Sequence, residues 1–467
     1  MVSDAQSRPL KELAREIFFA TLEDVAVPRL FERKLTRQGS VLHFGTENVD
    51  LAAFKVIWVI SFGKAAWAMF RALADVLGER YRPARGIIVS NLPPQRVFHG
   101  FMAYKASHPY PNYYSQVAAD AILENLRGAD EKTLICFLIS GGGSALVESP
   151  LEKSVTLEDV IALNRVLVGC GASIDEINSI RKHLSAVKGG RLAEAAAKAH
   201  QVTLLLSDVS EGNPATIASG PTLPDPTTIE MCTVVAERYN LLGKFPPAIR
   251  ELFEKKKLKE TPKPGAAAFE TSQVFVVGSS RDVLHAAHRQ AGARGFRAEC
   301  EMSCDDAPLA SAAECLFASL ERMQRENPGA PVAVISGGEI LCPVTGDGRG
   351  GRNQAFVLHA VERLAGSPSY APEGSGASEG REVAVLSAGT DGVDGNSPAA
   401  GAVADGETLA RAREMKVLDP SAPGLRASPA DYFRRSDSFS FFSALDDTLM
   451  TGPLENNLRD LRLLLTR

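Results

Sequence analysis

Short apolar runs recur along the chain, and six of them end in a turn rich in glycine, serine or aspartate. Runs of this length that are rich in Val and Ile are typical of strands buried on both faces. The six runs cover residues 57–60, 134–139, 202–206, 274–277, 332–335 and 383–386, and alanine-rich helical stretches cover residues 65–77, 117–126 and 282–293. This alternation predicts an α/β protein with largely parallel sheets.

Breaks in the pattern indicate the domain organisation. A basic run followed by two prolines and a glycine, at residues 251–265, predicts a linker. We therefore expect an N-terminal domain over residues 1–258 and a C-terminal domain over residues 266–450, with residues 451–467 packing back on the N-terminal domain. Residues 365–380, rich in Gly, Ser and Ala, predict a flexible surface loop. Near the start, Leu10, Leu13, Ile17 and Leu22 predict an amphipathic helix.

Length and composition exclude several classes of function. A chain of 467 residues indicates two or three domains. Its formal net charge of −5 argues against a protein that binds nucleic-acid backbone. No apolar run is long enough to predict a membrane span, and the N-terminal residues do not match a targeting peptide. Seven scattered cysteines without a CxxC pattern indicate neither a metal site nor a disulfide framework. We expect a cytoplasmic protein.

The glycine turns predict anion binding. In open α/β sheets, ligands bind at the carboxyl ends of the strands, where backbone N–H groups in a Gly–Ser turn can approach an anion. Neither the P-loop pattern nor GxGxxG is present, which disfavours a P-loop kinase and an orthodox dinucleotide-binding dehydrogenase. A glycine turn of this kind also occurs in esterases, but no GxSxG nucleophile accompanies it. Several such turns in both halves of the chain favour a polyanionic ligand.

Charged side chains accompany these turns. Lys64 directly follows Gly63 after a strand, where it can reach a phosphate; the other interpretation is a solvated lysine in the first helical turn. Cations are dense over residues 181–191, which form either a solvated helix face or a shaped loop around Gly189 and Gly190. Arg352 lies in a glycine-rich segment, an arrangement suited to bidentate recognition of carboxylate or phosphoryl oxygens.

Three acids follow strand ends. Asp208, Glu339 and Asp391 each occupy a position where a carboxylate can hold a metal or accept a proton. Capping of the next turn is the alternative role. The segment around Asp391 superficially resembles a calcium loop but lacks the ligand at position 12. Cations, carboxylates and anion-binding turns on two domains are the parts that phosphoryl transfer requires.

The sequence as a whole resembles the type II D-glycerate kinases, whose C-terminal part is the MOFRL domain. The resemblance rests on motifs that follow one another in order over nearly the whole chain. They are FGKAA (residues 62–66), LISGGGSAL (138–146), INSIRKHLSAVKGGRLA (177–193), LSDVS (206–210), IASGPTLPDPTT (217–228), ISGGE (335–339), GRGGRNQ (348–354) and LSAGTDGVDG (386–395).

This resemblance implies a Rossmann-like N-terminal α/β/α domain, a smaller α/β C-terminal domain and an active site in the cleft between the two domains. It implies phosphorylation of D-glycerate by ATP with Mg²⁺, typically to 2-phosphoglycerate. Matching motifs assign catalytic roles to Lys64, Arg352 and Asp208, the last as the base that orients the glycerate hydroxyl. They assign metal binding to Glu339 and Asp391. The expected substrate- and nucleotide-binding residues are Gly63, Gly141, Gly142, Gly143, Ser144, Lys188, Arg191, Gly337, Gly338, Asn353 and Asn457.

The chain departs from the family pattern at four positions. Glu211 stands near the place of an expected Gly-Asp pair, Ala355 replaces a common Glu, and Leu454 and Asn456 replace hydroxyl residues. These changes affect the expected ligand contacts more than the fold. The alternative functions are an NAD(P)H-dependent hydroxypyruvate reductase, which lacks its dinucleotide signature here, and a non-catalytic regulator that binds sugar phosphates. Phosphorylation of the 2- or the 3-hydroxyl and a possible homodimer are left open by the sequence.

Overall fold

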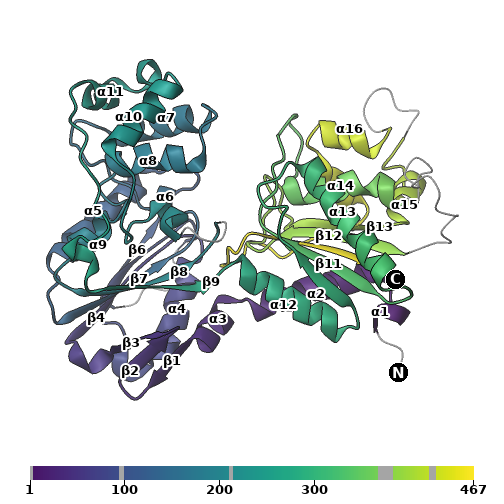
Figure 1. Cartoon of the computed structure of the whole chain (residues 1–467), viewed down its shortest axis with the longest axis horizontal. Helices are drawn as coiled ribbons and strands as arrows, with labels where there is room; N and C mark the ends of the chain where they lie inside the picture. Colours follow the sequence, from purple (N-terminus) through teal and green to yellow (C-terminus); the bar gives the residue numbers. More distant parts are fainter. Residues whose placement is uncertain (1–3, 94–98, 210–213, 366–381, 420–426) are drawn as a thin grey trace. The chain divides into compact units, whose positions relative to one another are not determined.

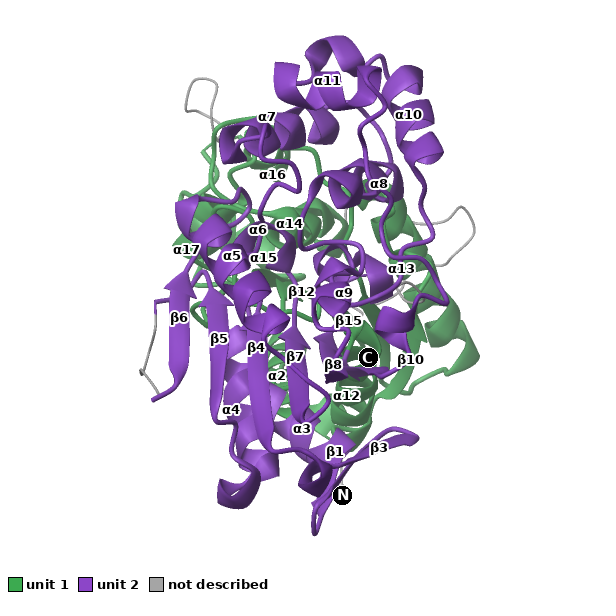
Figure 2. Ribbon diagram, turned by 90° about the vertical axis from the view of Figure 1, so that its left-hand side faces the viewer, with its two compact units in different colours: residues 1–26, 279–467 green, residues 27–278 purple. Residues whose placement is uncertain are grey.

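The computed structural model describes residues 4–93, 99–209, 214–365, 382–419 and 427–467. The chain divides into two compact units, which Figure 2 shows in different colours. Unit 2 comprises residues 27–278, and unit 1 comprises residues 1–26 together with residues 279–467. Within the described residues, no helix combines the length and the apolar character that crossing a membrane requires.

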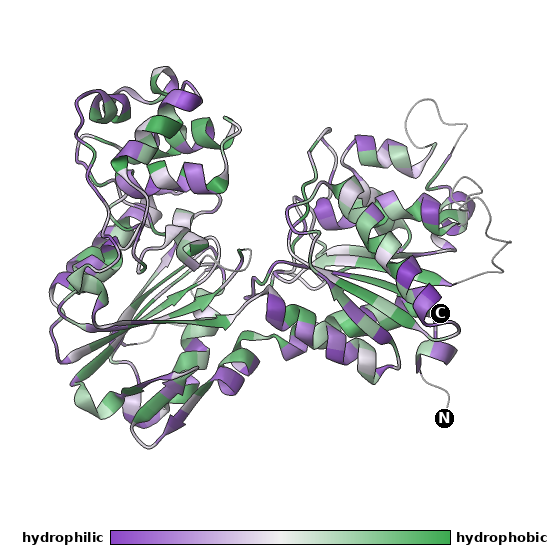
Figure 3. Ribbon diagram, in the orientation of Figure 1, coloured by the Kyte–Doolittle hydropathy of each residue, from purple (hydrophilic) through white to green (hydrophobic). Residues whose placement is uncertain are grey.

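Unit 2 contains a sheet of six parallel strands in the order β6-β5-β4-β7-β8-β9. Counted along the chain, this is the 3-2-1-4-5-6 order of a Rossmann fold, as expected. The strands are β4 (Val56–Phe62), β5 (Arg85–Ser90), β6 (Phe101–Lys105), β7 (Thr133–Ile139), β8 (His200–Leu206) and β9 (Ser272–Gly278). β4, β7 and β8 are almost entirely buried, as their continuous apolar runs predict. Figure 3 shows this apolar character along the strands.

Helices cover both faces of this sheet (Figure 1). α3 (Val27–Lys34) and α4 (Ala66–Leu77) pack on one side, and α5 (Tyr113–Arg127) and α9 (Arg191–Ala195) pack on the other. A separate helical cluster with its own apolar core is formed by α7 (Leu157–Val168), α8 (Ile174–Leu184), α10 (Ile229–Arg238) and α11 (Pro247–Glu254). A small antiparallel sheet of β1 (Leu35–Gln38), β2 (Val41–Phe44) and β3 (Glu47–Asp50), which the sequence analysis did not anticipate, completes unit 2.

Unit 1 contains a second six-stranded sheet, in the order β10-β11-β15-β12-β13-β14. Its strands are β10 (Arg297–Glu301), β11 (Val332–Gly337), β12 (Val383–Gly389), β13 (Gly401–Asp405), β14 (Thr448–Leu449) and β15 (Asp460–Thr466). Helices α2 (Leu10–Asp24) and α12 (Ser280–Ala293) pack against it, as do α13 (Leu309–Glu326) and α14 (Arg352–Leu364). The shorter helices α15 (Thr408–Glu414), α16 (Pro429–Arg434) and α17 (Ser438–Ala444) complete the unit.

This second sheet corrects the expectation of largely parallel sheets. Only β10 and β11 pair in parallel, and every other neighbouring pair is antiparallel. β15 is inserted between β11 and β12 and is antiparallel to both. β11 and β12 therefore still run in the same direction, and their carboxyl ends meet at one edge of the sheet.

The expected domain boundaries also need correction. β9 pairs with β8, so the chain stays in unit 2 until Gly278, beyond the expected linker at residues 251–265. Thr261 Oγ1 donates to the buried Asp225 at 2.9 Å, which anchors that segment. The first 26 residues belong to unit 1 with α2. Residues 451–467, expected to pack back on the N-terminal domain, also belong to unit 1 and supply its buried strand β15. The loop expected at residues 365–380 lies, except for Ala365, outside the described residues.

Candidate functional site

The strand order of unit 2 reverses between β4 and β7, which is where ligands bind in sheets of this kind. Two glycine turns follow these strands, and they are tied together. The Lys64 backbone N–H donates to the Gly141 carbonyl at 2.9 Å, and the Ala65 N–H donates to Ser140 Oγ at 3.0 Å. The structure therefore brings Lys64 and the Gly141–Ser144 turn together, as the sequence predicts.

Glycine is required where these turns approach each other. Gly63 has φ +127°, and a Cβ there would lie 2.1 Å from Ser140 Oγ. Gly142 has φ +80°, and a Cβ there would lie 3.4 Å from Lys64 Cγ and 3.2 Å from His108 Cδ2. The aliphatic part of Lys64 thus lies against the second turn, and the positive φ of Gly63 and Gly142 disfavours any larger residue at either position.

Ser144 ends the second turn and belongs to a chain of hydroxyl contacts. Its Oγ lies 2.7 Å from Ser219 Oγ, and Ser219 donates to Asn178 Oδ1 at 3.2 Å. Ser219 has φ +61° and is buried, so the segment after β8 is held closely against the turn. Gly143 permits this contact, since a Cβ there would lie 2.7 Å from Ala218 Cβ.

Lys188 is buried behind the turn. Its ammonium donates to the Ser144 carbonyl at 2.9 Å and forms an ion pair with the buried Glu148, which also accepts from Ser185 Oγ at 2.6 Å. Burial lowers the pKa of Lys188, although Glu148 acts in the opposite direction. The structure therefore places Lys188 as a support for the carbonyl of Ser144.

Arg191, which the sequence groups with Lys188, serves a different segment. Its guanidinium donates to the carbonyls of Lys259 and Glu260 at 3.3 and 3.1 Å. Those carbonyls belong to the segment expected to be a linker. Arg191 thus fixes the chain between α11 and β9.

Asp208 follows β8 at the same edge of the sheet as Lys64, and its side chain is half-buried. The preceding Ser207 N–H donates to the Gly278 carbonyl at 2.8 Å, which fixes the start of this loop. Glu211, the departure from the family pattern three residues after Asp208, lies outside the described residues.

The corresponding edge of unit 1 collects three carboxylates and an arginine. Gly337 is opposite Leu461 and Gly389 is opposite Asp460 in the sheet. The residues that follow β11 and β12 therefore lie beside the residue that begins β15. Glu339 and Asp391, both predicted, thus share their edge with Asp460.

Arg352, the first residue of α14, lies between two of these acids. Its Nε donates to Asp460 Oδ2 at 2.5 Å, and its terminal nitrogen lies 2.8 Å from Glu339 Oε1. Burial alone would lower the pKa of Arg352, but Asp460 and Glu339 outweigh it and raise that pKa above its ordinary value. Arg352 is therefore a fixed, fully charged cation, as phosphoryl recognition requires.

A buried acid, Asp394, holds the start of α14. Its two oxygens accept from the backbone N–H groups of Asn353 and Gln354 at 3.0 and 2.9 Å. Burial raises the pKa of Asp394 to about 6 despite these hydrogen bonds. Asn353 is itself buried and accepts from Ser387 Oγ at 2.6 Å, so it supports the position of Arg352.

The Gly337–Glu339 turn is held by hydrogen bonds to Arg462 and Asp305. The Arg462 guanidinium donates to the carbonyls of Gly337 and Gly338. The Glu339 N–H donates to Asp305 Oδ1 at 3.0 Å, and Asp305 in turn pairs with Arg459. This turn is therefore locked by contacts to β15 and to the loop after β10.

Asp391 and Asn457 lie on the segments beside this edge. Asp391 Oδ1 accepts from the Val393 N–H at 3.2 Å. A Cβ on Gly389 would lie 3.2 Å from Asp391 Oδ1 and 3.5 Å from Asp460 Oδ1, so both carboxylates lie close to this glycine. Asn457 is buried.

Three of the four departures from the family pattern lie in unit 1. The Asn456 side chain donates to the Val25 carbonyl at 3.1 Å, and the Leu454 N–H donates to the Asp391 carbonyl at 2.8 Å. Ala355 packs against the apolar core.

Several acids that organise these edges are not recognisable from the sequence. These acids contact residues that are distant in the sequence, and no local motif predicts such contacts. They are Glu148, Asp305 and Asp394. The signal for Asp394 was its place beside Asp391 in the segment first compared with a calcium loop. The signal for Asp460 was only its place three residues after Asn457, an expected binding residue.

Two family models match the chain. The Domain of unknown function (DUF4147) matches residues 13–254, and the MOFRL family matches residues 332–460. The curated D-glycerate 2-kinase of Thermotoga maritima is 34% identical over 97% of both chains. The chain belongs to the type II glycerate kinase family, which carries the MOFRL domain.

Further relatives agree with this family. The crystal structure of the glycerate kinase from Thermotoga maritima has a TM-score of 0.79 and 32% identity, covering 98% of this chain and 99% of that chain. A protein of Agrobacterium vitis named putative hydroxypyruvate reductase is 34% identical over 87% of this chain and 86% of its own length. Both labels weighed in the sequence analysis thus occur among members of the family.

Proposed function

We propose that this protein transfers the γ-phosphoryl group of ATP to D-glycerate and forms 2-phosphoglycerate. The observation that carries the proposal is the match over 97% of both chains with a D-glycerate 2-kinase. The two sheet edges support it, since one carries Lys64 beside glycine turns and the other carries Arg352 among carboxylates. These are the groups that phosphoryl transfer needs.

In this proposal Lys64 and Arg352 stabilise negative charge on the transferred phosphoryl group and on the glycerate carboxylate. Lys64 is a point charge on a flexible stem, whereas Arg352 presents a planar fork that its acidic partners orient. The turn from Gly141 to Ser144 offers backbone N–H groups to an anion. Gly337 and Gly338 would have the same role in unit 1.

Asp208 is the proposed base. The glycerate hydroxyl oxygen attacks the γ-phosphorus, its proton passes to the Asp208 carboxylate, and the bond from the γ-phosphorus to the bridging oxygen of ADP breaks. Its position after β8, at the edge where ligands bind in such sheets, supports this role.

The acidic edge of unit 1 fits Mg²⁺. Magnesium prefers oxygen ligands, and it is commonly held by one or two carboxylates while substrate phosphates and water complete its shell. Asp391 and Glu339 supply such oxygens without forming a complete protein cage. When bound, Mg²⁺ offsets the negative charge of the phosphates.

The test is an assay of the purified protein with D-glycerate, ATP and Mg²⁺, followed for ADP and phosphoglycerate. We expect ADP formation that depends on D-glycerate, and ³¹P NMR of the product should show the phosphate on the 2-hydroxyl. ADP formation with a 3-phosphorylated product would retain the kinase and reject the 2-position.

The second candidate is hydroxypyruvate reductase, because relatives from Agrobacterium vitis carry that name. Its expected dinucleotide pattern, GxGxxG with an acid about 20 residues later, does not follow β4. The same protein incubated with NADH or NADPH and hydroxypyruvate decides the matter. Oxidation of the cofactor without ADP formation in the first assay would replace the kinase proposal with the reductase.

A further inference from the structure

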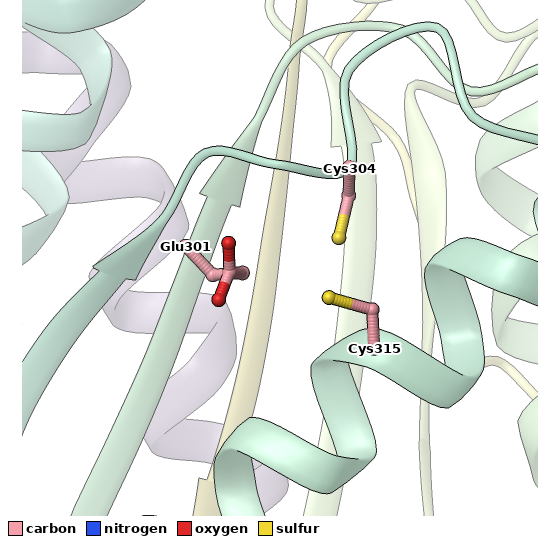
Figure 4. A group of neighbouring side chains, drawn as sticks. All are labelled: Glu301, Cys304 and Cys315. Atoms are coloured by element: carbon pink, nitrogen blue, oxygen red, sulfur yellow. The ribbon is translucent and has the colours of Figure 1, made fainter.

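Three side chains of types that commonly bind metals converge beside the loop that joins β10 to α13 in unit 1 (Figure 4). Glu301 ends β10, Cys304 lies on the loop, and Cys315 lies in the second turn of α13. One ligand atom from each residue, a carboxylate oxygen and two Sγ atoms, lies within 4.8 Å of the others. Among the described residues, this is the one group of three potential ligands that gathers so closely.

The chemistry of the three donors selects the ion. Thiolates prefer thiophilic cations, and one carboxylate with two thiolates is a donor set that zinc accepts. Zinc with three protein ligands completes its tetrahedron with water. Magnesium, which requires oxygen donors, does not fit. We propose that Glu301, Cys304 and Cys315 bind one Zn²⁺ ion, separate from the magnesium that phosphoryl transfer requires.

Neighbouring hydroxyl groups orient the carboxylate. Ser303 donates to Glu301 Oε1 from its N–H at 2.9 Å and from its Oγ at 2.7 Å, and Ser319 Oγ donates to Oε2 at 3.1 Å. Such outer partners fix the direction of a ligand before the ion arrives and are characteristic of metal sites. Glu301 is thus held in place although it is not fully buried.

Burial differs among the three ligands in a way that suits ion entry. Cys304 is 1% exposed, whereas Cys315 and Glu301 are only partly covered. Burial and the nearby Cys315 raise the pKa of the Cys304 thiol to about 12, so the free protein keeps it protonated. A bound cation reverses this effect, because it favours the thiolate and releases the proton.

The position of the site also indicates its effect. Asp305 directly follows Cys304, accepts from the Glu339 N–H and pairs with Arg459. An ion on Cys304 would therefore tie the loop before α13 to its helix and hold Asp305 in place. Through Asp305, the ion would also stabilise the glycine turn before Glu339.

The experiment is a titration of the reduced, chelator-treated full chain with Co²⁺, followed by Zn²⁺. We expect near-ultraviolet absorption from charge transfer between thiolate and cobalt, which saturates at one ion per chain and disappears when zinc replaces cobalt. Cys315→Ser should weaken zinc binding by about 100-fold or more. Ser319→Ala, which removes one partner of the carboxylate, should weaken it by about 10-fold.

Cys342→Ser is the matched control, since Cys342 is another partly covered thiol of unit 1. It should bind zinc as the unaltered protein does. Zinc should also raise the melting temperature of the unaltered protein and of Cys342→Ser, but not that of Cys315→Ser. Absence of the thiolate band in the reduced protein, or its loss in Cys342→Ser with retention in Cys315→Ser, would overturn the assignment.

Discussion

The two six-stranded sheets bring polar groups to one edge in different ways. In the six-stranded sheet of unit 2 all strands are parallel, so Lys64, the Gly141–Ser144 turn and Asp208 each follow a strand. In unit 1 the antiparallel β15 lies between β11 and β12, so its first residue, Asp460, joins the residues that follow those strands. A parallel sheet therefore displays its candidate site in sequence order, whereas a mixed sheet adds residues that precede a strand.

The edges also differ in how their charges are balanced. In unit 2 the buried Lys188 is matched by the buried Glu148, behind the turn that Lys64 contacts. In unit 1 Arg352 is matched at the edge itself by Glu339 and Asp460. The first edge thus keeps its buried ion pair apart from Lys64, the proposed catalytic cation, whereas at the second edge the proposed catalytic Arg352 is itself part of the ion pairs.

The largest effect should come from the structural charges of unit 2. Lys188→Met leaves Glu148 buried without its ammonium partner, and the free energy of unfolding should fall by about 3–5 kcal/mol. Urea denaturation measures it. The double variant Glu148→Gln/Lys188→Met removes both charges and should recover most of the loss. If the single variant were as stable as the unaltered protein, this pair would not support the turn.

A substitution of Lys64 tests the catalytic role proposed for this residue at the same edge. Lys64→Ala should lower kcat of the proposed kinase reaction by about 10²–10³-fold, because a preorganised electrostatic contact to the transition state is removed. The melting temperature should change little, since the side chain is only partly buried. The exposed Lys132→Ala is the control. Normal turnover in Lys64→Ala would remove the residue from the site.

Asp394 tests how the start of α14, and with it Arg352, is held in unit 1. Its pKa is about 6 in the folded protein and about 4 in an unfolded chain, so the folded state binds the proton more tightly. Its contribution to stability is therefore complete below about pH 4 and is lost as the pH rises through about 6. The loss is about 3 kcal/mol.

Urea denaturation at several pH values measures this loss as the difference between the unaltered protein and Asp394→Asn. The exposed Asp347→Asn serves as control and should leave the pH profile unchanged. An identical profile in Asp394→Asn would show that this acid does not titrate with a raised pKa.

The smallest effect concerns the turn before Glu339. Gly338 has φ +84°, and a Cβ there would lie 2.4 Å from Asp305 Oδ1, whereas Gly329 has φ +74° and open space around it. Both Gly→Ala variants carry the cost of positive φ, but only Gly338→Ala also displaces Asp305. It should be less stable than Gly329→Ala by about 1–2 kcal/mol. Equal stabilities in denaturant would mean that Asp305 moves without cost.

Much of unit 2 was predictable because its signals are local. The apolar runs of β4, β7 and β8 are continuous, and each is followed by its own turn. Unit 1 was harder, since nothing in residues 460–466 tells which strands β15 joins. The domain boundary failed for a similar reason, because the polar segment at residues 251–265 lies before a strand that returns to the first sheet.

The candidate site residues also divide into those with a local sequence signal and those placed only by contacts between distant segments. Lys64, Asp208, Glu339, Arg352 and Asp391 were recognisable from their places at turns and from the family resemblance. Their partners were not, because Asp460 is 108 residues from Arg352 and Glu148 is 40 residues from Lys188. The convergence of Cys304 with Cys315 was also hidden, since their spacing matches no metal motif.

The sequence by itself determined the α/β class, the buried strands and the glycine turns, because periodicity and backbone freedom act over a few neighbouring residues. The tertiary structure decided which strand separates β11 from β12, which acids orient Arg352 and where Lys188 finds its counter-charge. Those choices depend on strand pairing and burial between distant segments, where sheet register brings together groups that are unrelated in sequence.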